Sequence, residues 1–238
     1  PPRSTPKPSS AASDVYKRQT QGRLIVIEGP DYVGRSLHAR LLSERLEAHG
    51  VAVATVGLAR SELMGELIKA NTHELHQLNW RTRALLYATD LHDQIIHELQ
   101  PLLDAGFVVI ADRYTLTPLI REQIRGGDAQ WIEGLYANIP TPDLTIILQA
   151  GGRRLLNRMM HNGSLVQLNS FEAGVDMALS PSITKSFLNY QKKIRSAFVE
   201  HASKDSSPII HTKQSVKDVH SQIWDEVSPV LKDMIQPL

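Results

Sequence analysis

Residues 29–36 carry a glycine-rich pattern that restricts the fold more than any other feature of the sequence. They read Gly-Pro-Asp-Tyr-Val-Gly-Arg-Ser, which fits G-x-x-x-x-G-K-[ST] with Arg35 in the place of the lysine. The pattern lies between a short apolar run, residues 23–28, and a stretch with helical periodicity, residues 36–49. Glycines let backbone N–H groups turn inward around phosphate oxygens, and the following helix directs its N-terminus at the same charge. This context favours a phosphate-binding loop over an ordinary glycine-containing turn between strand and helix.

Such a loop predicts a nucleotide with a Mg²⁺ ion as its ligand. We expect ATP to be bound by Gly29, Pro30, Asp31, Tyr32, Val33, Gly34, Arg35, Ser36 and Leu37. Arg35 would neutralise the terminal phosphates, and the Ser36 hydroxyl would be a ligand of Mg²⁺. Arginine keeps the charge of lysine but carries a wider, planar, forked head. The sequence therefore predicts phosphate binding and leaves the rate of phosphoryl transfer open.

Alternating apolar runs and amphipathic stretches predict one α/β domain with a parallel, doubly wound sheet of five strands flanked by helices. The predicted strands are residues 23–28, 51–55, 107–111, 143–148 and 207–211. The predicted helices are residues 36–49, 62–70, 80–104, 117–125, 129–138, 153–161, 181–202 and 216–235. Pro101 is expected to bend the predicted helix over residues 80–104 near its end. Residues 162–180, with Gly, Ser and Asn, are the candidate for a short, mobile lid.

Residues 1–20 are expected to lie outside the domain, which we place at residues 21–238. They are rich in Pro and Ser and lack hydrophobic periodicity. Residues 14–19 also read like a translated transposon end from DNA library preparation, so we interpret this tail as non-native; the alternative is a natural disordered tail. It holds four basic residues and one acidic residue, so the net charge of +1 becomes −2 without it. The sequence pI of about 8.5 is therefore no argument for nucleic-acid binding. With no cysteine and no apolar run long enough to span a bilayer, we expect a cytoplasmic protein.

Four segments resemble the thymidylate kinase family in order and spacing, across roughly residues 22–235. Residues 27–31 (IEGPD) resemble its F-E-G-x-D opening, and residues 85–90 (LLYATD) resemble its L-L-F-x-A-[DN]-R helix. Residues 112–114 (DRY) match its D-R-Y signature, and residues 142–144 (PDL) resemble its P-D-L-T segment. The resemblance implies a P-loop NTPase-type kinase core with a lid that transfers the γ-phosphoryl group of ATP to dTMP, giving dTDP and ADP.

The resemblance also implies roles for individual residues. Asp31 would lie near the sugar and phosphate of the acceptor, and Asp112 would organise the Mg²⁺–phosphate region. Arg113 would contact the acceptor phosphate, and Tyr87 would stack on the pyrimidine. We therefore expect Arg35, Asp31, Asp112 and Arg113 to be catalytic. The alternatives are a salt bridge between Asp112 and Arg113, and simple helix-face packing of Tyr87.

The sequence departs from the family pattern on the acceptor side. The R-E-P segment of the family after the second strand is absent, and Arg60 is the candidate to supply the lost phosphate contact of the acceptor site from a shifted position; the alternative is a surface arginine. Leu91 stands where the family has the arginine that reads the thymine edge. Residues 120–122 (IRE) replace an aromatic or glutamine-bearing segment, and residues 162–180 contain no Lys or Arg. Arg158, on the helix before the lid, is the candidate lid cation, unless it belongs to a solvated helix face.

These observations leave three functions open. The first is a nucleoside monophosphate kinase that acts on dTMP or a related nucleotide. The second is a catalytically weak or inactive nucleotide-binding protein of the same fold, and the third is a kinase for a different small-molecule acceptor. The expected partners are small-molecule nucleotides, without nucleic acid or membrane. The resemblance also implies a homodimer formed through helices, for which the apolar face of residues 85–99 is a candidate, as it is for the core.

Overall fold

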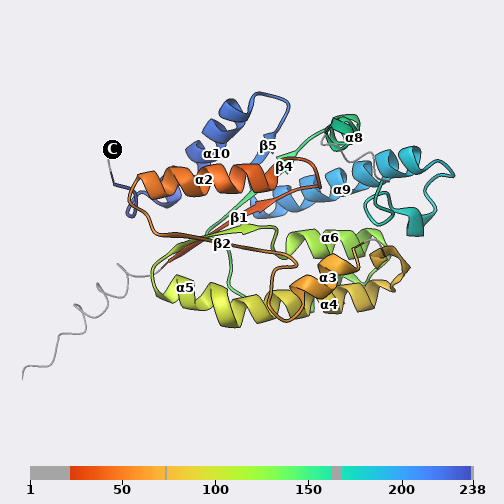
Figure 1. Ribbon diagram of the computed structural model, residues 1–238, viewed down its shortest axis with the longest axis horizontal. Helices are drawn as coiled ribbons and strands as arrows, with labels where there is room; N and C mark the ends of the chain where they lie inside the picture. The colour runs from red at the N-terminus through yellow and green to blue at the C-terminus, as the bar shows by residue number, and fades with distance from the viewer. Residues whose placement is uncertain (1–21, 73, 162–167, 237–238) are drawn as a thin grey trace, which may run out of the picture.

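The computed structural model describes residues 22–72, 74–161 and 168–236, and these form a three-layer α/β domain (Figure 1). The residue 1–20 tail and residues 162–167 of the predicted lid lie outside the described residues. The five strands are β1 (Arg23–Glu28), β2 (Val53–Gly57), β3 (Val108–Asp112), β4 (Leu144–Gln149) and β5 (Ile209–His211). They pair in the order β2-β3-β1-β4-β5, and every pair is parallel. The predicted five-stranded parallel sheet is confirmed.

Helices cover both faces of the sheet. The α-helices are α2 (Arg35–Ala48), α3 (Gly65–Ala70), α4 (Trp80–Gln94), α5 (Gln100–Asp104), α6 (Leu116–Ile124), α7 (Ala129–Gly134), α8 (Gly152–His161), α9 (Ile183–Asp205) and α10 (Val216–Val230). Figure 1 shows α2 and α10 on one face, with α4, α5 and α6 on the other. Side chains alternate along the buried strands, so Ile25 and Ile27 pack in the cluster under α2 and α10, whereas Leu24 and Val26 pack under α4 and α5. No described helix is long and apolar enough to cross a membrane.

The observed elements differ from the predicted ones mainly at their ends. The second strand begins at Val53 rather than at residue 51, because the turn that ends α2 uses Gly50 and Val51. Gly50 adopts φ +75°, and the N–H of Val51 donates to Leu46 O at 3.1 Å. The predicted helix over residues 80–104 contains a π-helical turn, Ile95–Leu99, directly before Pro101, which has no N–H to continue the α-helical pattern.

The carboxyl ends of three strands meet beside Asp112. Asp112 is the last residue of β3 and is in register with Ile27 of β1 and Gly57 of β2. In parallel sheets this edge is where ligands bind. The loop that follows β1, residues 29–34, therefore lies next to the end of β3.

A buried carboxylate fixes the chain that leaves β3. Glu28 at the end of β1 is 0% exposed and accepts hydrogen bonds from the N–H groups of Tyr114 (2.9 Å) and Thr117 (3.2 Å) and from the Thr117 hydroxyl (2.5 Å). These donors lie at the N-terminus of α6, where a negative charge is favourable. Glu28 therefore holds the turn at residues 113–115 and sets where α6 begins.

We predict that Glu28→Gln lowers the free energy of unfolding by about 2 kcal/mol, because an amide presents one acceptor oxygen and one donor group to a set of donors. Urea unfolding followed by circular dichroism measures the change. Glu44→Gln is the matched control, since that side chain is 60% exposed, and its effect should stay within about 0.5 kcal/mol. Equal stability of the two variants would contradict the capping role of Glu28.

Candidate active site

The loop between β1 and α2 has a backbone shape that only particular residues adopt. Gly29 and Gly34 have φ of +139° and +104°, and Tyr32 lies in the left-handed region at +61°. A Cβ on Gly29 would lie 2.4 Å from Leu148 O of the neighbouring strand β4, so a side chain is excluded there. Successive turns of this kind direct backbone N–H groups into a concave, anion-binding surface at the start of α2.

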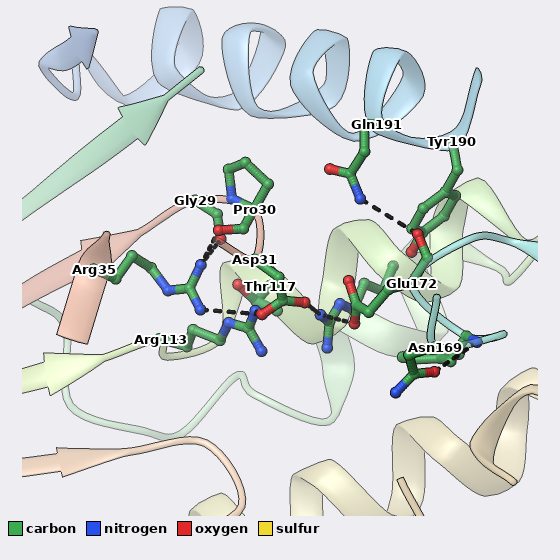
Figure 2. Close-up of polar contacts among 12 residues, drawn as sticks. Gly29, Pro30, Asp31, Arg35, Arg113, Thr117, Asn169, Glu172, Tyr190 and Gln191 are labelled. Atoms are coloured by element: carbon green, nitrogen blue, oxygen red, sulfur yellow. Dashed lines mark hydrogen bonds and ion pairs between the residues drawn. The ribbon is translucent and has the colours of Figure 1, made fainter. Parts of the chain in front are cut away.

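Arg35 lies folded against this loop and joins it to the end of β3. Its Nη1 donates to Gly29 O at 2.6 Å and to Pro30 O (Figure 2), and its Nε donates to Asp112 Oδ1 at 3.0 Å. These contacts use the fork of the guanidinium, since one compact ammonium group could not reach such separated acceptors in the same way. Arg35 is only 8% exposed, so its charge is held within the site.

Asp112 collects hydroxyl and guanidinium donors. The Ser36 hydroxyl donates to Asp112 Oδ2 at 2.5 Å, and Arg60 Nη2 lies 3.3 Å from the same oxygen. Burial alone would raise the pKa of Asp112, but Arg35 and the Ser36 hydrogen bond hold it below its ordinary value. Asp112 and Arg113 do not pair with each other among the described contacts; each has a different partner. Asp112 is therefore an ionised carboxylate beside a hydroxyl.

Asp31 is the meeting point of three guanidinium groups. Its Oδ1 accepts from Arg113 and lies 3.4 Å from Arg35 Nη2, and its Oδ2 accepts from Arg121 Nη2 at 2.7 Å. Figure 2 shows Arg35 and Arg113 on one side of Asp31 and Glu172 on the other. Burial would raise the pKa of Asp31, but Arg113 and the other neighbours hold it well below the ordinary value. Asp31 therefore remains charged.

Glu172 is a second carboxylate on the same arginine. Arg121 Nη2 donates to Glu172 Oε1 at 2.5 Å. Burial raises the pKa of Glu172 to about 7; Arg121 opposes this shift and the nearby Asp31 carboxylate adds to it. The Arg121 guanidinium thus connects an ionised carboxylate with one that titrates near neutral pH.

A pocket of about 300 Å³ opens beside these charges. Tyr87 of α4 and Phe171 form aromatic walls and are 4% and 1% exposed. Asp31, Arg113, Arg121 and Glu172 line its polar part. An apolar pocket with a few charged groups at one end suits a small ligand with an anionic group and a flat ring.

Phe171 is also the centre of a cluster of arginines. The guanidinium carbons of Arg125, Arg121 and Arg83 lie 4.0, 5.2 and 5.3 Å from its ring centroid. Arg125 also pairs with Asp176 at 2.8 Å and donates to Phe171 O at 2.7 Å. The segment at residues 169–176 is therefore attached to α6 by its charges as well as by its ring.

The structure brings most of the residues predicted for the site together. Asp112, Arg35, Asp31 and Arg113 form one chain of contacts in that order, and Arg60 reaches Asp112 from the loop after β2. Their catalytic roles remain predictions, as do the nucleotide contacts of loop residues 29–37.

Arg158 and Leu91 lie away from this cluster. Arg158 Nη1 donates to Val33 O at 2.9 Å, and its Nη2 donates to Thr212 O at 2.7 Å, so it supports the outer side of the loop. It is not part of a purely solvated helix face. Leu91 is 1% exposed in the apolar cluster beneath the sheet, with Ile95 and Leu99, and does not line the pocket.

Sequence reasoning did not assign three residues that the structure places in this pocket: Arg121, Phe171 and Glu172. In the sequence, Arg121 stood out only as part of residues 120–122, a segment that departs from the family pattern. Arg121 lies on the predicted helix over residues 117–125, which begins four residues after Arg113 at the end of a predicted strand, and this closeness could have suggested that both lie near the same ligand. Phe171 and Glu172 lie in an irregular segment without periodicity, and no spacing rule connects such a segment with α6.

A glycine loop at the start of α2, an Asp-Arg pair at the end of a parallel strand and an adjoining aromatic pocket define a phosphotransferase of the P-loop class. The family model described as thymidylate kinase matches residues 27–223. The "Probable thymidylate kinase 2" of Saccharolobus solfataricus is 30% identical over 204 residues, which cover 85% of this chain and 94% of that protein. The "Thymidylate kinase" of Schizosaccharomyces pombe is 29% identical over 214 residues, or 90% of this chain and 95% of that protein. The chain belongs to the thymidylate kinase family and is a kinase.

We predict that replacing Glu172 by Gln makes stability less dependent on pH. Because the pKa of Glu172 is raised from 4.5 to about 7, the folded state holds more protons than the unfolded state between these values. The free energy of unfolding therefore falls as pH rises through this window, by up to about 3 kcal/mol above pH 7. The free energy of unfolding of Glu172→Gln minus that of wild type should therefore increase as the pH rises from 5 to 8.

Urea unfolding of both proteins at several pH values measures this difference. Glu66→Gln, an 89% exposed side chain on α3, reports the effect of removing a carboxylate without burial. The raised pKa of Glu172 would be contradicted if the free energy of unfolding of Glu172→Gln minus that of wild type stayed constant, or fell, as the pH rises.

Proposed function

We propose that this protein transfers the γ-phosphoryl group of ATP to dTMP, giving dTDP and ADP. The observation that carries the proposal is the junction of two binding regions at Asp31. The glycine loop and α2 lie on one side of it, and the pocket with Tyr87, Phe171 and Arg113 lies on the other. A phosphoryl group can pass between two substrates only if both phosphates reach the same place.

Each side of the junction has groups suited to its substrate. The loop amides and Arg35 would hold the terminal phosphates of ATP, and Arg113 would hold the acceptor phosphate. Tyr87 and Phe171 would enclose the pyrimidine and exclude water. The apolar position of Leu91 leaves recognition of the base edge to other groups of the pocket.

Ser36 and Asp112 fit a Mg²⁺ ion. Their oxygens are 2.5 Å apart, Ser36 is exposed, and Asp112 is ionised by its neighbours. Mg²⁺ prefers hard oxygen ligands and few protein groups in phosphoryl-transfer sites. When bound, the ion would neutralise negative charge on the phosphate oxygens of ATP.

The reaction requires little covalent chemistry from the protein. An oxygen of the acceptor phosphate bonds to the γ-phosphorus, while the bond to the β–γ bridging oxygen breaks and its electron pair leaves with ADP. A phosphate monoester has its second pKa near about 6, so at neutral pH the attacking oxygen needs no general base. The guanidinium groups of Arg35, Arg60 and Arg113 would offset the charge that spreads over the transferred group.

We predict that, among nucleoside monophosphates, dTMP gives the highest kcat/KM for ADP release with Mg²⁺ and ATP. A coupled assay over dTMP, dUMP, UMP, CMP, AMP and GMP measures it. Bound ATP without turnover on any acceptor would indicate an inactive nucleotide-binding protein, and a strong preference for another acceptor would replace dTMP.

Arg35 variants serve as controls in the same assay. Arg35→Met removes the charge beside the loop and should lower kcat by about 100-fold or more. Arg35→Lys keeps that charge and should retain much more of the activity than Arg35→Met. Equal losses in the two variants would show that the fork of the arginine, rather than its charge, is required.

A homodimer and a cytoplasmic location are part of the same proposal and rest on the family resemblance. Most of the apolar residues in the second half of α4 belong to the core, but Leu85 of α4 and Ile96 of the π-helical turn that follows it are 49% and 65% exposed.

We predict that the wild type sediments as a dimer and that the double variant Leu85→Glu with Ile96→Glu sediments as a monomer. A variant that remains dimeric with the wild-type dissociation constant would exclude this face.

A further inference from the structure

Two arginines on different elements converge on one carboxylate inside the pocket. Arg113 follows β3 and has φ +70°, and Arg121 lies on α6. Each binds a different oxygen of Asp31, so the two guanidinium groups lie on the two sides of a single carboxylate. A carboxylate held in this way occupies the kind of position that a phosphate takes between two arginines.

Both arginines have donors that the protein does not use. Arg113 Nε is buried without a hydrogen-bond partner among the described residues. The hydrogen bonds of Arg121 all come from Nη2, to Asp31 and Glu172, which leaves its Nε and Nη1 without a described partner. The Arg113 Nε is buried, so leaving it unpaired is costly, and a ligand with several acceptor oxygens would satisfy this donor together with those of Arg121.

The neighbouring arginines of α4 and α6 differ in this respect. Arg83 is paired with Glu122 at 2.8 Å and donates to Leu75 O at 3.0 Å. Arg125 uses all three nitrogens, on Asp176, Phe171 O and the Tyr190 hydroxyl among others. Neither contacts Asp31 in the described structure. Arg83 and Arg125 therefore have structural partners, whereas the partners of Arg121 are two carboxylates that line the pocket.

The charge of the site also leaves room for an anion. The connected cluster contains four guanidinium groups and three carboxylates; its members are Arg35, Arg60, Arg113, Arg121, Asp31, Asp112 and Glu172. It is positive by one charge when every carboxylate is ionised, and more so when Glu172 is protonated. A dianionic group next to Arg113 and Arg121 would be strongly attracted.

We propose that Arg121 is a second phosphate-binding residue of the acceptor site, which clamps the acceptor phosphate together with Arg113. Glu172 is its positioning residue: it holds the Arg121 guanidinium at the pocket and yields it to the phosphate. This inference rests on the proposed function, since it assigns the phosphate of that same acceptor.

The test compares dTMP with thymidine, which lacks only the phosphate. Isothermal titration calorimetry gives the ratio of the two dissociation constants, which is the contribution of the phosphate to affinity. We expect Arg121→Met to reduce this ratio by about 10- to 100-fold, the value of a charge-assisted contact, with little change in thymidine or ATP affinity. Arg121→Lys should recover part of the ratio.

Two further variants separate binding from folding. Arg125→Met is the matched control, because Arg125 lies one helical turn away, stacks on the same Phe171 ring and anchors the same segment. It should lower the melting temperature and leave the ratio unchanged. Glu172→Gln removes the anion that competes with the phosphate for Arg121, so it should raise the ratio, and a ratio that does not rise would contradict the role given to Glu172.

The outcomes are distinct. The role of Arg121 is overturned if folded Arg121→Met has the wild-type ratio of dissociation constants, or if it loses the same affinity for dTMP as for thymidine. Either result leaves the proposed function intact. A wild type that binds dTMP no more tightly than thymidine contradicts both. If Arg125→Met reduces the ratio as much as Arg121→Met, the effect is structural and the assignment to Arg121 fails.

Discussion

The active site depends on the buried carboxylate of Glu28. It is the last residue of β1, directly before the glycine loop, and its hydrogen bonds reach the turn after β3 and the first turn of α6. One side chain therefore sets the relative position of the nucleotide loop, Arg113 and the helix that carries Arg121. A buried carboxylate is stable only when such donors surround it, so loop, turn and helix must form together.

Charge pairing continues this arrangement into the pocket. Asp31 extends from the glycine loop and is bound by arginines from α2, from the turn after β3 and from α6, so it connects three parts of the chain that secondary structure alone does not join. The guanidinium groups are kept close together by the carboxylates between them. Replacing those carboxylates by substrate phosphates preserves the pairing, which allows a highly charged site to be folded both before and after the substrates bind.

The sequence predicted the fold and the position of the glycine loop between a strand and a helix well, because both depend on local patterns. Short apolar runs separated by helical stretches predicted the five parallel strands. The loop at residues 29–36 and the pair Asp112–Arg113 each lie at a strand end, where parallel strands converge. Strand and helix ends were less accurate, since the turn at Gly50 and the π-helical turn before Pro101 depend on hydrogen bonds that composition does not reveal. Glu172 was missed because its importance comes from one contact, with Arg121, that spans 51 residues in an irregular segment.

The Phe171 ring links ligand binding in the pocket to the attachment of its own segment, residues 169–176, to α6. The ring forms a wall of the pocket and also contacts the guanidinium groups of Arg83, Arg121 and Arg125. If the segment that carries this ring detached from α6, the pocket would lose a wall and the three arginines would lose a shared cation–π partner. By thermodynamic linkage, an acceptor that contacts the ring must tighten the attachment of the segment to α6, and anything that loosens that attachment must weaken the acceptor. The affinity for a ligand that contacts this ring is thus coupled to how firmly residues 169–176 are attached to α6.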